Sequence, residues 1–264
     1  MSVALHPLPH WSVPLRRQHA VLVQSGRVLV LFLAQLAILA LIHLDRAADD
    51  SLVAGHVPLV IEGMAGLLYT AVGWALLVWP GESRSRRGYH HSLPVHSGRH
   101  DLLRVLAGAT WLLASVTFYY IAGAALGAAT RAIPVWEFPF RLWLNGYTLA
   151  LTVYLAASVL PLLVDRALEW TLGATVAIGV PIGMVADANP GGPLAIIKWI
   201  FDSRYGMHTA MLGGMNGGRV ETYRRLLGWR GWTPPAAEEY YIAAALWLGL
   251  AALAVLLATR RRRA

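Results

Sequence analysis

The sequence predicts an all-α protein that crosses a membrane with six helices. Hydrophobic residues make up 57% of the 264-residue chain and charged residues only 14%, whereas about a quarter of the residues of a soluble domain are charged. Six apolar runs come close to or exceed the roughly 20 residues that a helix needs to cross a bilayer. Because backbone polar groups in hydrocarbon need internal partners, each run should form a helix. No internal repeat or low-complexity linker divides the chain, so residues 1–264 are expected to form a single transmembrane domain.

The six predicted spans are separated by polar connections of very different length. They cover residues 27–44, 53–79, 102–130, 138–164, 168–186 and 240–259. Tryptophan and tyrosine gather near the ends of these runs, as in the aromatic belts of membrane proteins.

Two further segments are expected to lie at the membrane surface. Residues 9–26 mix apolar and basic side chains and predict an N-terminal amphipathic helix, although the prolines around them keep a flexible tail as the alternative. Residues 187–239, between the fifth and sixth spans, hold short apolar pieces broken by glycine and proline. They predict a broken segment of re-entrant or surface-lying helices at 194–201 and 220–227, with a plain extracellular loop as the alternative.

The arginines predict which side of the membrane each connection faces. The net charge is +8, and Lys198 is the only lysine. If both termini are cytoplasmic, most arginines fall on the inner side, as the positive-inside rule requires. The inner side then carries Arg16, Arg17, Arg27, Arg84, Arg86, Arg87, Arg99, Arg104, Arg166 and Arg260 to Arg263. A multi-pass protein of the cell membrane is therefore expected, and its basic balance is attributed to anionic lipid rather than to nucleic acid.

The sequence lacks the motifs of several kinds of chemistry. The chain has no cysteine, which excludes disulfides and thiolate metal sites. Lys198 is followed by Trp199, so the Gly-Lys-Ser/Thr tripeptide of a phosphate-binding loop is missing. Neither GxSxG nor HExxH occurs. No catalytic residue, metal or cofactor is therefore expected in this chain, and it is not expected to be an enzyme.

Three of the polar residues inside the predicted spans are candidates for a specific role. Glu62 sits in the second span, where a carboxyl group is costly unless it is paired, hydrated or neutral. It is a candidate for lining a substrate pathway, and the alternative is a glutamate near the outer interface that water reaches. Gln35 and Asn145 are expected to form hydrogen bonds between helices.

The connection between the second and third spans carries a motif. It reads PGESRSRRGYHHSLPVHSGRHDLLRVLAG, from position 80 to position 108. It resembles the cytoplasmic loop in the membrane subunits of type-2 ATP-binding cassette (ABC) exporters, which has an acidic-basic start, an LP(V/I)SR-like turn and a helix that enters the third span. The chain departs from that pattern in two places, because Glu82 and Arg84 are not adjacent and because His96 and Gly98 interrupt the turn. The family's six spans, cytoplasmic termini, amphipathic approach helix and broken segment all have counterparts here.

The resemblance implies a mechanism in which this loop forms a short coupling helix on a separate ATPase subunit. The docking residues would be Glu82, Arg84, Arg86, Arg87, Tyr89, Leu93, Pro94, Val95 and Arg99. The chain would then be a permease that moves a lipid-like or amphipathic substrate, together with a second copy of itself or a related chain. ATP and Mg²⁺ would be bound by the partner subunit.

Two other functions remain open from the sequence. His96 and His100 are spaced i, i+4 and would share one face of a helix, which is the spacing of a metal-dependent membrane enzyme. A non-catalytic scaffold subunit of a membrane complex is the third reading.

Overall fold

The described part of the chain is built of helices. The computed structural model describes residues 12–48, 58–79, 97–129, 140–164, 203–211 and 236–261, and these residues contain no strand. The helices are α1 (Ser12–Gln24), α2 (Arg27–Ala48), α3 (Pro58–Val78), α5 (Ser97–Ala129), α6 (Phe140–Leu163), α10 (Met207–Met211) and α12 (Ala237–Arg261).

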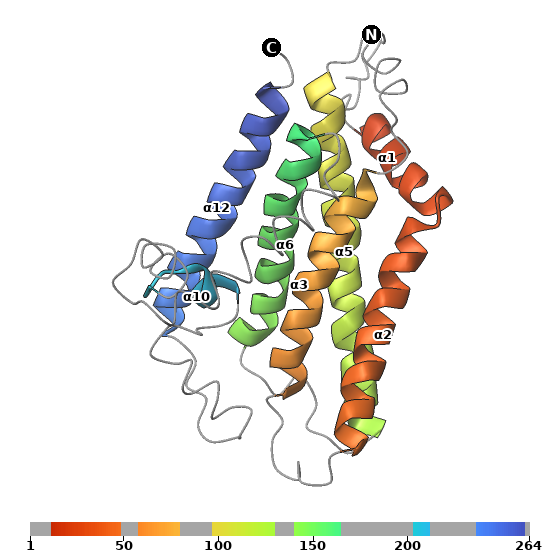
Figure 1. Ribbon diagram of the computed structural model, residues 1–264, viewed down its shortest axis with the longest axis vertical. Coiled ribbons are helices and arrows are strands. Elements are labelled where there is room, and N and C mark those ends of the chain that lie inside the picture. The colour runs from red at the N-terminus through yellow and green to blue at the C-terminus, as the bar shows by residue number, and fades with distance from the viewer. Residues whose placement is uncertain are drawn as a thin grey trace, which may run out of the picture.

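The long helices form an elongated bundle (Figure 1). α6 packs between α3 and α12, while α5 lies against α6, α3 and α2. α3, α6 and α12 run in one direction, and α2 and α5 run in the other. The end of α3, the start of α5, the end of α12 and α1 therefore lie together, at what we call the loop end of the bundle.

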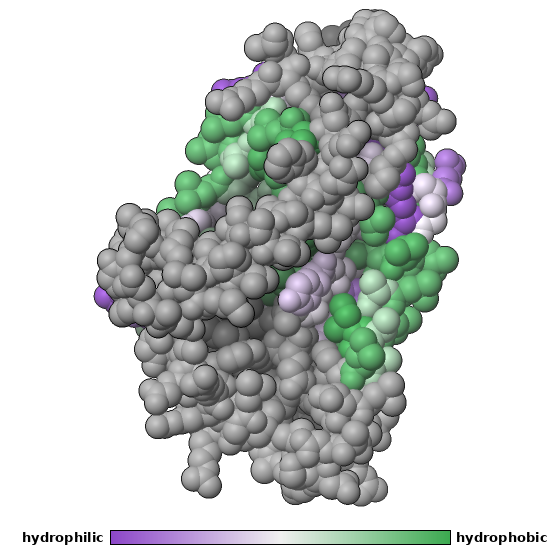
Figure 2. Space-filling model, in the orientation of Figure 1, coloured by the Kyte–Doolittle hydropathy of each residue, from purple (hydrophilic) through white to green (hydrophobic). Residues whose placement is uncertain are grey.

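Several helices have the length and composition of membrane spans. Arg99–Leu126, Leu144–Leu163 and Ala237–Arg260 are each long and apolar enough to cross a bilayer, and α1 and α2 add a fourth if the bent pair counts as one span. The outward faces of α2 and α12 expose a series of leucines, including Leu29, Leu33, Leu246, Leu250, Leu253 and Leu257. Figure 2 shows hydrophobic surface over both helices. Soluble monomers rarely expose apolar surface on this scale, so the fold is that of a membrane protein.

Five predicted spans overlap helices of the structure, with shifted boundaries. α3 begins at Pro58, five residues after the predicted start, because proline fits the first turn of a helix, where an N–H has no partner. α5 begins at Ser97 and thus includes Arg99, which the sequence places in the loop. The predicted span 168–186 and the predicted short helices at 194–201 and 220–227 lie outside the described residues.

Two short helices pack against the long ones, α1 against α5 and α2, and α10 against α12 and α6. α1 occupies the segment predicted to form an N-terminal helix, whereas α10 was not predicted, because five residues are too few to show a helical period. α1 ends at a turn in which Gly26 has φ of 71°, a left-handed conformation that closes helices. The Gly26 N–H donates to the Val23 carbonyl, and the axes of α1 and α2 differ by 61°.

The two amides predicted to bond between helices, those of Gln35 and Asn145, have different surroundings. Asn145 on α6 is buried, and its carbonyl accepts a bond from the Thr148 hydroxyl of the same helix at 3.0 Å. The predicted bond between helices stays a prediction for Asn145. Gln35 on α2 is completely buried, but neither atom of its amide has a hydrogen-bond partner within the described part of the chain. The predicted bond between helices is therefore missing for Gln35 among these residues.

A pair of hydroxyl groups joins α6 to α12. The hydroxyl groups of Thr148 and Tyr240 lie 2.8 Å apart. A double-mutant cycle of Thr148→Val and Tyr240→Phe should give a coupling free energy of about 0.6 kcal/mol, the average for such bonds in a membrane bundle. Thr110→Val is the matched control, because within the described part of the chain that exposed hydroxyl bonds to the Leu106 carbonyl of its own helix. Thermal unfolding of the purified chain measures the cycle, and strict additivity would show that the pair contributes nothing.

Candidate functional site at the base of the 80–96 connection

The two helices that flank residues 80–96, α3 and α5, are joined by hydrogen bonds to one carbonyl group. Val78 is the last residue of α3, where helix carbonyls lack an intrahelical donor. Its oxygen accepts bonds from Nε and Nη2 of Arg104 at 2.9 and 2.6 Å, and from Nη1 of Arg27 at 3.1 Å. Both cations also face the negative end of the α3 dipole. α2, α3 and α5 therefore meet at a single backbone atom.

Arg104 is held in a confined position. Its side chain is only 4% exposed, and the guanidinium lies 5.4 Å from the centroid of the Trp79 ring. A cation over an indole face is stabilised by the ring quadrupole, more strongly when water is excluded. The bidentate contact and the stacked ring together fix the plane of the guanidinium, which a flexible lysine could not reproduce. We call Val78, Trp79 and Arg104, with Arg27, the arginine clamp.

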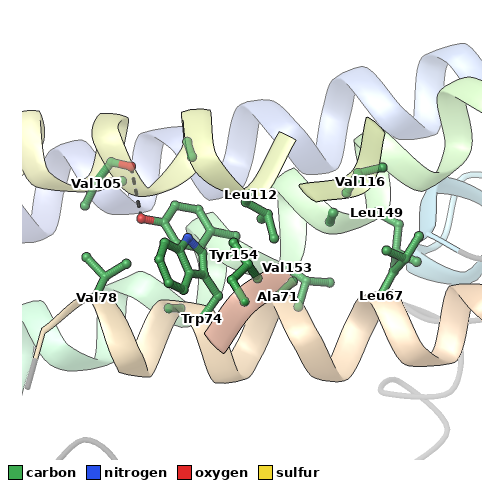
Figure 3. Close-up of a cluster of buried hydrophobic side chains, with 14 of the residues drawn as sticks. Leu67, Ala71, Trp74, Val78, Val105, Leu112, Val116, Leu149, Val153 and Tyr154 are labelled. Atoms are coloured by element: carbon green, nitrogen blue, oxygen red, sulfur yellow. Dashed lines mark hydrogen bonds between the residues drawn. The ribbon is translucent and has the colours of Figure 1, made fainter. Parts of the chain in front are cut away.

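A second layer of contacts lies directly beneath the clamp. The Trp74 indole on α3 donates to the Gly108 carbonyl on α5 at 2.8 Å, and the Tyr154 hydroxyl on α6 donates to the Val105 carbonyl at 3.0 Å. Figure 3 shows Trp74 and Tyr154 side by side between the three helices, with Val78 and Leu112 around them. Both aromatic side chains are almost completely buried. The clamp therefore stands on a rigid junction of three helices.

α1 is attached to the same junction through the first turns of α5. Gln18 Nε2 lies 2.9 Å from His100 Nε2, and His100 Nδ1 lies 3.8 Å from a carboxylate oxygen of Asp101. His19 meets the edge of the Trp111 ring. His100, a candidate metal ligand in the sequence, is thus engaged with α1, and the described residues contain no group of three potential ligands.

Of the predicted docking residues, the structure describes Arg99. Arg99 lies in the first turn of α5, whereas the other predicted docking residues lie outside the described residues: Glu82, Arg84, Arg86, Arg87, Tyr89, Leu93, Pro94 and Val95. Glu62 belongs to the first turns of α3, at the opposite end of that helix from Val78, and its side chain is outside the described part.

Sequence reasoning missed Arg104 and Arg27 as site residues. A signal for Arg104 was present, because it falls inside the predicted span 102–130, and an arginine within a span is costly unless it has a specific partner. No sequence signal marks the Val78 carbonyl, since every residue carries one.

Charge is distributed unevenly between the two ends of the bundle. Described arginine side chains at the loop end are Arg16, Arg17, Arg27, Arg99, Arg104 and Arg260, and Asp101 is the described carboxylate among them. At the opposite end Arg204 binds Glu239 at 2.8 Å, with Glu238 beside it. The described side chains at the loop end therefore carry a net positive charge.

No protein-family model, curated protein or solved structure matches the chain.

Proposed function

We propose that the chain is the permease subunit of an ABC transporter, driven by a separate ATPase subunit that docks on the 80–96 connection. The observation that carries the proposal is the arginine clamp. Because Arg104 on α5 holds the last carbonyl of α3, a force applied to the connection would enter both helices together instead of bending one of them.

The contacts around the clamp give this force a route into the bundle. Tyr154 would pass it to α6, Arg27 to α2, and the Gln18–His100 contact to α1. Packed cores move between discrete arrangements rather than deforming continuously. A docking ATPase would therefore tilt the loop ends of these helices as a unit and change access to a pathway between the permease chains.

The direction of the helices favours six crossings and cytoplasmic termini. α6 and α12 run parallel, so α12 begins at the opposite end of the bundle from the end of α6. The proposed span 168–186 would account for this change of end and would be the sixth crossing beside those of α2, α3, α5, α6 and α12. α1 and the end of α12 then share the arginine-rich side, which the positive-inside rule assigns to the cytoplasm.

The chemistry of the connection suits a protein partner. Tyr89, Leu93 and Val95 supply apolar anchors, and arginines such as Arg86 and Arg87 supply donors for acidic groups on the ATPase. The nucleotide and Mg²⁺ would be bound by that partner. Glu62 is proposed to face the pathway of a lipid-like or amphipathic substrate, because a carboxyl group inside a span is otherwise costly.

The test is affinity purification of the full chain in mild detergent from cells that express it with its natural neighbours. We expect an ATPase subunit to co-purify, and the double variant Leu93→Asp/Pro94→Ala to reduce its recovery at least tenfold without lowering the unfolding temperature of the permease. Arg260→Gln, at the loop end but outside the connection, is the control and should leave recovery unchanged.

Three outcomes would overturn the proposal. Full recovery of the ATPase by the double variant would remove the docking role. A stable complex without any ATPase would favour the scaffold function. Stoichiometric iron or zinc that is lost in His96→Ala/His100→Ala would favour the metal-dependent enzyme.

A further inference from the structure

We infer that the outward face of α1 binds the phosphate headgroups of anionic phospholipids in the leaflet at the loop end. One side of α1 is used inside the protein, since Gln18 and Leu22 are buried and α1 packs on α5. The other side is exposed and carries Arg16 and Arg17. This inference does not depend on the proposed transport function.

The exposed face combines charge with apolar side chains. Val13 is 73% exposed and Val23 is 50% exposed, and both lie on the same side of the helix as the two arginines. A soluble phosphate compound would leave the valines uncovered. An amphiphile can use both groups, because its phosphate meets the guanidinium and its acyl chains cover the apolar side chains.

The turn at Gly26 sets the tilt of α1 relative to α2. α1 makes an angle of 61° with α2, so if α2 lies along the membrane normal, α1 lies within about 30° of the membrane plane. Its long side then runs along the interface instead of descending into the hydrocarbon. Figure 2 shows hydrophilic surface beside hydrophobic surface around the turn between α1 and α2.

The two arginines face no compensating carboxylate in the described part of the chain. α1 contains no acidic residue. Asp101, the described carboxylate at the loop end, is 6% exposed and lies beside His100. Arg27 is turned inward to the Val78 carbonyl. The anion that Arg16 and Arg17 attract is therefore expected to come from outside the protein, and the guanidinium fork matches a phosphate group.

The test is native mass spectrometry of the full chain titrated with phosphatidylglycerol or phosphatidylcholine of equal chain length. We expect preferential retention of phosphatidylglycerol, weakened about tenfold or more in Arg16→Gln/Arg17→Gln, since each juxtamembrane arginine contributes about fivefold. Arg16→Lys/Arg17→Lys keeps the charge and should retain most of the binding. Arg260→Gln/Arg261→Gln removes two charges at the same end of the bundle and should change it little.

The same titration contains the results that would overturn the inference. Equal retention of phosphatidylglycerol by the native chain and by Arg16→Gln/Arg17→Gln would remove the site from α1. An equal loss in the Arg260→Gln/Arg261→Gln control would show that only overall charge matters. Binding of glycerol 3-phosphate as tight as that of the lipid would show that the ligand is a soluble phosphate compound.

Discussion

Replacing Arg104 with methionine should destabilise the protein by about 2–3 kcal/mol and loosen the base of the 80–96 connection. A hydrogen bond to a charged group contributes about 1.5–3 kcal/mol, and Arg104 makes two such contacts with the Val78 carbonyl and stacks on Trp79. Methionine restores the apolar volume but supplies no donor. The removed cost of burying a charge offsets part of the loss, which is why the expected effect is below the sum of the contacts.

Two measurements check this prediction on the purified full chain. Thermal unfolding in detergent measures the loss of stability. Pulsed electron paramagnetic resonance between spin labels at Leu77 and Leu106 measures the separation of α3 and α5, and both positions are exposed enough to accept a label. We expect one narrow distance distribution in the native chain and a broad one in Arg104→Met.

Matched variants separate the clamp from a general effect of charge. Arg104→Lys keeps the charge but loses the planar, bidentate contact, so it should recover only about half of the stability. Arg27→Met removes one of the three bonds to the carbonyl and should cost less than Arg104→Met. An Arg104→Met variant with native stability and an unchanged distance distribution would show that the clamp does not hold the two helices.

The positions of most helices follow from the sequence because the membrane imposes a simple rule. A backbone in hydrocarbon must bond internally, so an apolar run of sufficient length becomes a helix whatever its neighbours are. The predicted spans at 27–44, 102–130, 138–164 and 240–259 all overlap described helices. The boundaries were less predictable, because polar residues such as Arg99 and Asp101 continue α5 outside the apolar run.

The contacts between helices could not be predicted in the same way. Arg104 binds a carbonyl 26 residues away, and Gln18 meets His100 across 82 residues, so no local pattern links either pair. The prediction for Gln35 used only its residue type, and the structure leaves its amide without a partner among the described residues. Residue type predicted that a polar group would be buried but not which group it would face.

The candidate site likewise has one part that the sequence predicts and another that it does not. The motif around Leu93 and Pro94 predicts a docking site in the connection between the second and third spans. The described residues instead show how the helices on either side of that connection are joined. The junction depends on the Val78 carbonyl as a backbone acceptor and on the packing of Trp74 and Tyr154. Because backbone acceptors are present at every residue, this part of the site becomes visible only in three dimensions.

Gly108→Ala should destabilise the junction beneath the clamp by about 1–2 kcal/mol, although alanine is the better helix former. A Cβ atom at this position would overlap the Tyr154 hydroxyl and would lie 3.0 Å from Val78 Cγ2. Overpacking of this kind costs about 1–3 kcal/mol, and the gain in helix propensity returns up to about 1 kcal/mol. Tyr154 cannot easily move aside, because its side chain is completely buried and bonded to the Val105 carbonyl.

A second substitution and a control glycine test whether the overlap is the cause. Tyr154→Phe alone should destabilise the chain, since it loses the bond to Val105. In the Gly108→Ala background it should instead recover stability, because it removes the oxygen that the new methyl group meets. Gly249→Ala has nothing within 4 Å of its Cβ, so it should be neutral or stabilising. Thermal unfolding of the four variants measures these changes in stability. Additive effects of Gly108→Ala and Tyr154→Phe would show that α5 and α6 do not approach each other through this glycine.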